Sequence, residues 1–219
     1  GIEPGDIKTI DDITKLPFTY KTDLRDTYPF GMISVPFEDV VRIHASSGTT
    51  GKQTVVAYTK NDLDAWAGCI ARGLSSIGAT KKDIFHISYG YGLFTGGLGI
   101  NGGVEKFGAA VIPASTGNTV RQINILKDFK PTIICCTPSY ALYLGETIKE
   151  QGLTDQLSLK YGIFGAEPWT EEMRKNILEK TFRFSKRELS EFTPSYTCDV
   201  LQNGIQQIGM TINYGVKPL

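Results

Sequence analysis

The stretch "TIICCTPSYALYLGETIKEQG", residues 132–152, joins a short apolar run to a long segment with helical periodicity. "TIICCT" (132–137) is apolar and β-branched, which predicts a buried strand. "PSYALYLGETIKEQG" (138–152) predicts a helix, with proline at the first helical position, where it is favoured. A strand that leads directly into a helix is typical of a parallel sheet, because parallel neighbours need a long return connection.

The same alternation continues on both sides of this stretch, from residue 39 to residue 180. β-Branched runs predict strands over 39–45, 54–59, 83–89, 109–114 and 159–165. Segments with helical periodicity predict helices over 61–78, 95–108, 118–130 and 167–180. The sequence therefore predicts an α/β fold, a mostly parallel sheet with helices on both faces.

Composition excludes several kinds of partner. The 219 residues contain 23 Lys and Arg and 23 Asp and Glu, so no basic face for nucleic acid is expected. No apolar run approaches the roughly 20 residues that cross a bilayer, so we expect no membrane partner and a cytoplasmic location. The cysteines lack C-x-x-C spacing, and His44 and His86 are interpreted as strand residues, so no metal site is predicted.

The two ends of the chain differ from its middle. Residues 1–38, which include Pro17, Pro29 and Pro36, predict an extended, capped segment that packs on the domain. After residue 180 only weak strand candidates occur, such as "QIGMTINY" (207–214), so 181–219 is interpreted as a divergent tail of uncertain structure. The chain opens at Gly1 with structured-looking residues, which favours a fragment of a longer product.

The loop within "HASSGTTGKQTVVAY" (44–58) has the composition of a phosphate site. Gly48 and Gly51 allow positive φ and close approach of an anion to the backbone, and Lys52 adds a positive charge. Hydroxyl donors come from Ser46, Ser47, Thr49 and Thr50. It is not a Walker A loop, because a strand follows the lysine. The alternative, a solvated turn of a hairpin, is equally consistent with the composition.

"SSGTTGK" (46–52) resembles the phosphate-binding signature of the adenylate-forming acyl-CoA ligase superfamily. Five further segments stand in the order typical of phenylacetate-CoA ligases, from about Gly1 to about Lys180. They are residues 12–32, 89–99, 117–122, 137–146 and 165–169. The resemblance implies that 1–180 is part of the large N-terminal domain of such an enzyme, and that the C-terminal lid domain is absent.

The resemblance implies a two-step reaction. An aryl carboxylate such as phenylacetate and ATP form an acyl-adenylate, and the thiol of coenzyme A then displaces AMP to give the thioester. ATP, Mg²⁺ and coenzyme A are the implied cofactors, and a homodimer is compatible with the family. Because a carboxylate must approach an anionic phosphate, the site needs cations and N–H donors that spread the charge.

The same resemblance assigns three groups of binding residues, while the catalytic residues stay unknown. Residues 46–52 would hold the β- and γ-phosphates of ATP. The adenine site would consist of Gly165, Ala166, Glu167 and Pro168. The aryl acid would lie against Tyr89, Tyr91, Phe94, Thr137, Pro138 and Ser139. The alternatives are a helix with an acidic first turn, an aromatic core cluster and an ordinary proline helix start.

The sequence departs from the family pattern at two places. "GINGGVE" (99–105) has Asn101 and Gly102 where the family has histidine and tyrosine, which predicts a wider or more polar acyl pocket and an acid that could differ from phenylacetate. After Lys180 the glutamate for Mg²⁺, the ribose-binding aspartate and the lysine of the lid are missing. We therefore expect weak nucleotide binding and negligible turnover. The alternatives are an adenylating relative for another acid or acceptor, and a non-catalytic nucleotide-binding fragment.

Overall fold

Two compact units make up the chain, Gly1–Lys60 and Asn61–Leu219. The computed structural model describes residues 1–46, 48, 51–181 and 210–212. The predicted partition into 1–180 and a tail stays a prediction. The first unit contains the helices η1 (Pro4–Asp6), η2 (Ile10–Lys15), α1 (Lys21–Asp26) and η3 (Phe37–Asp39), and the strands β1 (Val40–Ala45) and β2 (Val55–Thr59).

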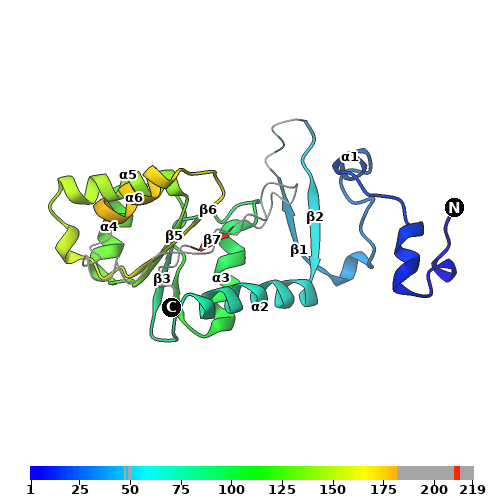
Figure 1. Ribbon diagram of the computed structural model, residues 1–219, viewed down its shortest axis with the longest axis horizontal. Coiled ribbons are helices and arrows are strands. Elements are labelled where there is room, and N and C mark those ends of the chain that lie inside the picture. The colour runs from blue at the N-terminus through cyan, green and yellow to red at the C-terminus, as the bar shows by residue number, and fades with distance from the viewer. Residues whose placement is uncertain (47, 49–50, 182–209, 213–219) are drawn as a thin grey trace. The chain divides into compact units, whose positions relative to one another are not determined.

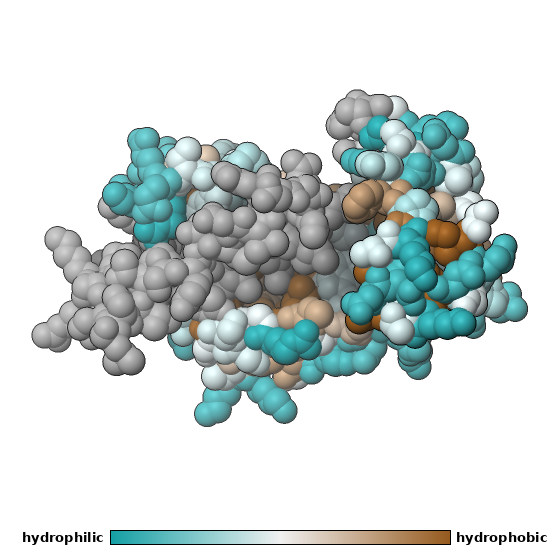
Figure 2. Space-filling model, turned by 45° about the vertical axis from the view of Figure 1, so that its right-hand side comes forward, coloured by the Kyte–Doolittle hydropathy of each residue, from teal (hydrophilic) through white to brown (hydrophobic). Residues whose placement is uncertain are grey.

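In the first unit, β1 and β2 form an antiparallel hairpin that ends at the pair Ala45 and Val55. Both strands were predicted, but they form their own two-stranded sheet instead of joining the parallel one (Figure 1). Large apolar side chains remain exposed in this unit, among them Ile10, Phe18 and Phe37. Figure 2 shows apolar (brown) and hydrophilic (teal) side chains interspersed on the visible face.

The second unit alternates strands and helices, as the sequence predicts. Its elements are α2 (Lys60–Ser76), β3 (Ile84–Ile87), α3 (Gly96–Phe107), β4 (Ala110–Ile112), α4 (Thr119–Asp128), β5 (Ile133–Cys136), α5 (Pro138–Glu150), η4 (Thr154–Gln156), β6 (Tyr161–Gly165), α6 (Glu171–Thr181) and β7 (Met210–Ile212). Among the described residues the strand order is β4-β3-β5-β6-β7. The pairs β3/β4, β3/β5 and β5/β6 are parallel, and β6/β7 is antiparallel.

Helices cover both faces of this sheet, because successive side chains of each strand point to opposite sides. On one face, Ile133 and Cys135 of β5 belong to a buried cluster with Ile70 and Leu74 of α2 and Ile100 and Val104 of α3. On the other face, Ile134 and Cys136 belong to a cluster that α4, α5 and α6 complete. Figure 1 shows the two groups of helices on opposite sides of the strands. The predicted α/β class is thus confirmed.

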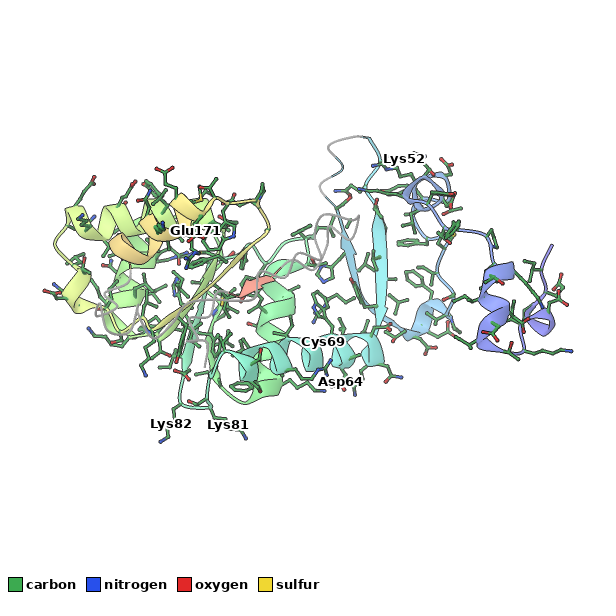
Figure 3. All side chains as sticks on the ribbon, in the orientation of Figure 1. Lys52, Asp64, Cys69, Lys81, Lys82 and Glu171 are labelled. Atoms are coloured by element: carbon green, nitrogen blue, oxygen red, sulfur yellow. The ribbon has the colours of Figure 1, made fainter. Side chains whose placement is uncertain are left out.

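The glycines of α3 are explained by the close approach of α2. A Cβ added at Gly99 would lie 2.2 Å from the Trp66 ring, and one at Gly103 would lie 2.1 Å from Cγ2 of Ile70. Lys106 of α3 forms an ion pair with Asp64 of α2, which Figure 3 labels. Glycine weakens a helix, but here it provides the space into which a large side chain of the neighbouring helix fits.

Candidate functional site

The end of the β1–β2 hairpin is closed by hydrogen bonds around Ser46. The Ser46 amide donates to the Thr54 carbonyl, and the Thr54 amide donates to Ser46 Oγ, both at 3.0 Å. Gly48 and Gly51 have φ of 70° and 123°, and the Gly51 amide donates to the Gly48 carbonyl at 3.0 Å. Both glycines therefore use the positive φ that the sequence predicts for them. Ser47, Thr49 and Thr50 lie outside the described residues.

Lys52 is exposed near the end of the hairpin (Figure 3). Its Nζ atom lies 5.8 Å from the centroid of the Tyr28 ring, which is within the range of a cation–π contact. Ligands gather at the carboxyl ends of parallel strands, but β1 and β2 form an antiparallel sheet of their own. This rule therefore gives no reason to expect a ligand at the loop between them. That the loop shares one centre with the residues of the second unit stays a prediction.

In the second unit, Tyr89 links the carboxyl ends of the parallel strands. Its hydroxyl lies 2.6 Å from the Cys136 carbonyl and 3.3 Å from the Gly165 carbonyl, the last residues of β5 and β6. Burial raises the pKa of Tyr89, so the group stays a protonated donor. A Cβ added at Gly96 would lie 3.8 Å from the Tyr89 ring. The ring thus packs against the first residue of α3.

Tyr91 and Phe94, the other predicted aryl-site aromatics, differ in exposure. Tyr91 is half-buried and packs against the cluster around Phe85, while Phe94 is 47% exposed. The Tyr91 hydroxyl donates to Asn101 Oδ1 at 3.2 Å, and the Asn101 amide nitrogen donates to Glu105 Oε1 at 2.8 Å. Burial is the first cause that raises the pKa of Tyr91. Asn101, which departs from the family pattern, therefore contacts a predicted substrate-binding residue.

Thr137, Pro138 and Ser139 form the start of α5, as predicted. Thr137 is the N-cap, and its Oγ1 accepts a hydrogen bond from the Tyr140 amide at 3.4 Å. The Ser139 amide donates to Glu167 Oε1 at 2.5 Å, across the gap between α5 and the loop after β6. The structure thus brings the predicted aryl-site and adenine-site residues together at one edge of the sheet.

The loop after β6 differs from the prediction at one point. The sequence placed the helix start at Glu167, but α6 begins at Glu171. Thr170 precedes it, and its Oγ1 accepts a hydrogen bond from the Met173 amide at 3.1 Å, as an N-cap does. Gly165 is buried, Ala166 and Pro168 are exposed, and Ala166 has a left-handed φ of 72°. Glu167 consequently lies in an irregular loop and not in a first helical turn.

A buried polar network that sequence reasoning missed lies beside this edge. Gln122 is 0% exposed. Its Oε1 atom accepts from Ser88 Oγ at 3.0 Å and lies 2.5 Å from His86 Nε2. Its Nε2 atom donates to the carbonyls of Ser115 at 2.8 Å and Gly117 at 3.3 Å. The sequence signal was a glutamine beside the apolar positions of an amphipathic helix, since Ile123 and Leu126 of α4 are also buried.

His86 is buried in β3, as its interpretation as a strand residue predicts. Burial lowers its pKa to about 4, and the contact with Gln122 opposes this only in part. His86 is therefore neutral at pH 7, with Nε2 as the donor to Gln122. Among residues 1–46, 48, 51–181 and 210–212, no three His, Cys, Asp or Glu side chains cluster as a metal site. No helix in the same residues is long and apolar enough to cross a membrane.

Comparison with known proteins identifies relatives of this chain. No family model matches. The phenylacetate-coenzyme A ligase of Pseudomonas putida is 54% identical over 181 residues, which cover 82% of this chain and 41% of the relative. The phenylacetate-coenzyme A ligase of Escherichia coli (strain K12) is 54% identical over 179 residues, 81% of this chain and 41% of the relative.

A solved structure with the same fold is an open conformation of 2-hydroxyisobutyryl-CoA ligase in complex with 2-HIB-AMP and CoA. Its TM-score is 0.73 at 27% identity, and the match covers 83% of this chain and 44% of that one. The chain spans about two fifths of the length of the curated relatives it matches. On this sequence identity over four fifths of its residues, the chain belongs to the phenylacetate-CoA ligase family.

Proposed function

We propose that this chain is part of an enzyme that activates an aryl acid such as phenylacetate with ATP and transfers the acyl group to coenzyme A. The observation that carries the proposal is the 54% identity to phenylacetate-coenzyme A ligases over 82% of the chain. The fold supports it, since a ligase with a TM-score of 0.73 was solved with an acyl-AMP and CoA. We place the reaction in the cytoplasm, with small molecules as partners and a homodimer as the assembly.

The hairpin loop 46–52 would hold the phosphates of ATP. Gly48 and Gly51 have the positive φ that lets successive amides face an anion, and Lys52 is exposed beside them. The hydroxyl hydrogen of Ser46 stays available to a phosphate, because Ser46 Oγ acts as an acceptor toward Thr54. Binding of ATP, measured directly, separates a phosphate-binding loop from a closed turn of the hairpin.

The edge that Tyr89, Ser139 and Gly165 form would hold the acyl-adenylate. The exposed residues Ala166 and Pro168 would contact the adenine with their backbone, and the exposed Phe94 would contact the aryl group. Mg²⁺ would bind with the phosphates of ATP. Coenzyme A would supply the thiol that displaces AMP from the acyl group.

The proposal is tested by calorimetry on the 219-residue chain. We expect heat on titration with Mg²⁺ and ATP, and tighter binding of the non-hydrolysable sulfamoyl analogue of phenylacetyl-AMP. The corresponding 2-hydroxyisobutyryl analogue separates an aryl from an aliphatic acid. Equal affinity for the two analogues would contradict an aryl substrate, and no heat with any nucleotide would contradict the ligase assignment of this chain.

Turnover is measured separately, as pyrophosphate-dependent ATP exchange with phenylacetate. We expect no exchange above background from this chain by itself, because it spans about two fifths of its relatives' length. Exchange at a measurable rate would show that the matched part of the relatives suffices for adenylation. It would contradict the expected inactivity and support the proposed reaction.

A further inference from the structure

The Glu167 carboxylate occupies a defined position at the start of α5. Pro138 has no amide hydrogen, and the Tyr140 and Ala141 amides both donate to Thr137. The Ser139 amide is the remaining donor of this turn, and it donates to Glu167 Oε1 at 2.5 Å. A carboxylate is stabilised there because the N-terminus of a helix carries partial positive charge. The Glu167 carboxylate thus caps the N-terminus of the neighbouring helix α5.

This contact holds the loop on one side of a strained residue. Ala166 has a φ of 72°, a left-handed conformation that is unfavourable for a residue other than glycine. Before it, the Gly165 carbonyl accepts from the Tyr89 hydroxyl at 3.3 Å. After it, Glu167 is bound to Ser139, and the Trp169 ring packs edge-on against Phe164 with centroids 5.8 Å apart. Anchors on both sides keep Ala166 in this conformation.

We propose that Glu167 is a positioning residue, which fixes the backbone of residues 165–168 through α5 and does not contact the nucleotide with its carboxylate. The inference rests on the proposed function, in which that backbone lines the adenine. It follows that the loop recognises the base with main-chain groups, while the acidic side chain sets their direction. Replacing the carboxylate by another acceptor of the same length should preserve binding.

The test compares Glu167→Ala with Glu167→Gln in the full chain. Glu172, an exposed carboxylate in the first turn of α6, provides the matched control as Glu172→Ala. Hydrogen exchange of the Ser139 amide and of the amides of residues 165–167 and 169 is measured without ligand. Affinities for AMP and GMP are measured by calorimetry, because the ratio between them reports on the base contact and a general loss of stability would leave that ratio unchanged.

We expect Glu167→Ala to speed exchange of the Ser139 amide, to weaken AMP binding about tenfold, and to narrow the ratio between AMP and GMP. Glu167→Gln should restore both affinities to within about threefold, and Glu172→Ala should change neither. If Glu167→Gln loses AMP affinity while the Ser139 amide stays protected, the carboxylate contacts the ligand and the proposal is wrong. If the parent chain binds no nucleotide, the proposed function fails. Unchanged exchange at 165–167 and 169 in Glu167→Ala would still overturn the positioning role by itself.

Discussion

Gly102 and Gly103 are neighbours on α3 with opposite surroundings, and this difference predicts opposite effects of the same substitution. A Cβ added at Gly103 would lie 2.1 Å from Cγ2 and 2.3 Å from Cβ of Ile70, while nothing lies within 4 Å of one added at Gly102. The Ile70 atoms are branched and close to the backbone, so they cannot move aside without moving α2. We therefore compare Gly103→Ala with Gly102→Ala.

The expected magnitudes follow from two contributions. Alanine in a helix is favoured over glycine by about 1 kcal/mol, and both variants gain this amount. Overpacking destabilises a core by about 1–3 kcal/mol, and it occurs only in Gly103→Ala. The propensity gain cancels in the comparison, so the free energies of unfolding of the two variants should differ by about 1–3 kcal/mol. Gly102→Ala should be more stable than the parent chain.

Urea unfolding followed by circular dichroism measures this difference, provided that the slopes of the transitions agree. The double variant Gly103→Ala with Ile70→Ala should be destabilised less than the sum of its single changes, because the steric conflict is absent from it. Equal unfolding free energies for Gly102→Ala and Gly103→Ala would refute the close approach of α2 and α3.

Three further predictions concern the polar groups near the sheet edge. Gln122→Leu should lower the free energy of unfolding in urea by about 2–4 kcal/mol, because it leaves buried His86 and Ser88 without their acceptor. A loss of less than about 0.5 kcal/mol would contradict the network. The folded pKa of His86, about 4, lies below the ordinary 6.5, so the unfolded chain protonates first and about 3 kcal/mol of stability should disappear as the pH falls from 6.5 to 4. His86→Asn should flatten this pH dependence, and an unchanged pH profile would show that other groups cause it. Asn118, the N-cap of α4, has a φ of 46°, and its side chain accepts a hydrogen bond from the Arg121 amide at 3.0 Å. In thermal melting, Asn118→Ala should lower the free energy of unfolding by about 1–2 kcal/mol, and Asn118→Gly should lower it less. The reverse order of the two variants would contradict the cap.

The strands and helices of the second unit could be predicted because their signals are local. "IICC" is apolar at four successive positions, and the structure places alternate residues of β5 in the two core clusters. Pro138 occupies the first position of α5, where proline is favoured, and Gly108 follows α3 with the left-handed φ that glycine adopts at helix ends. Local patterns were less exact at the start of α6, where a threonine cap competes with an earlier acidic residue.

Partnerships between distant residues could not be predicted. The sequence leaves a hairpin between β1 and β2 open as one interpretation, but it does not indicate that the two strands form a sheet apart from the parallel one. The contact between Ser139 and Glu167 spans 28 positions, and that between His86 and Gln122 spans 36. Gly99 and Gly103 of α3 face Trp66 and Ile70 of α2, and the sequence around the glycines does not indicate these partners. Each case depends on which elements pack together, and short-range propensity does not contain that information.

The antiparallel pairing of β7 with β6 affects how readily a shortened chain would aggregate. Phe164 and Gly165 of β6 are paired with Thr211 and Met210, and β7 lies within the weak strand candidate 207–214 that the sequence indicates. A chain shortened before Met210 would expose the main-chain hydrogen-bonding groups along that side of β6. An unpaired strand of apolar residues recruits strands from other molecules. β7 thus acts against self-association because it covers this side of β6.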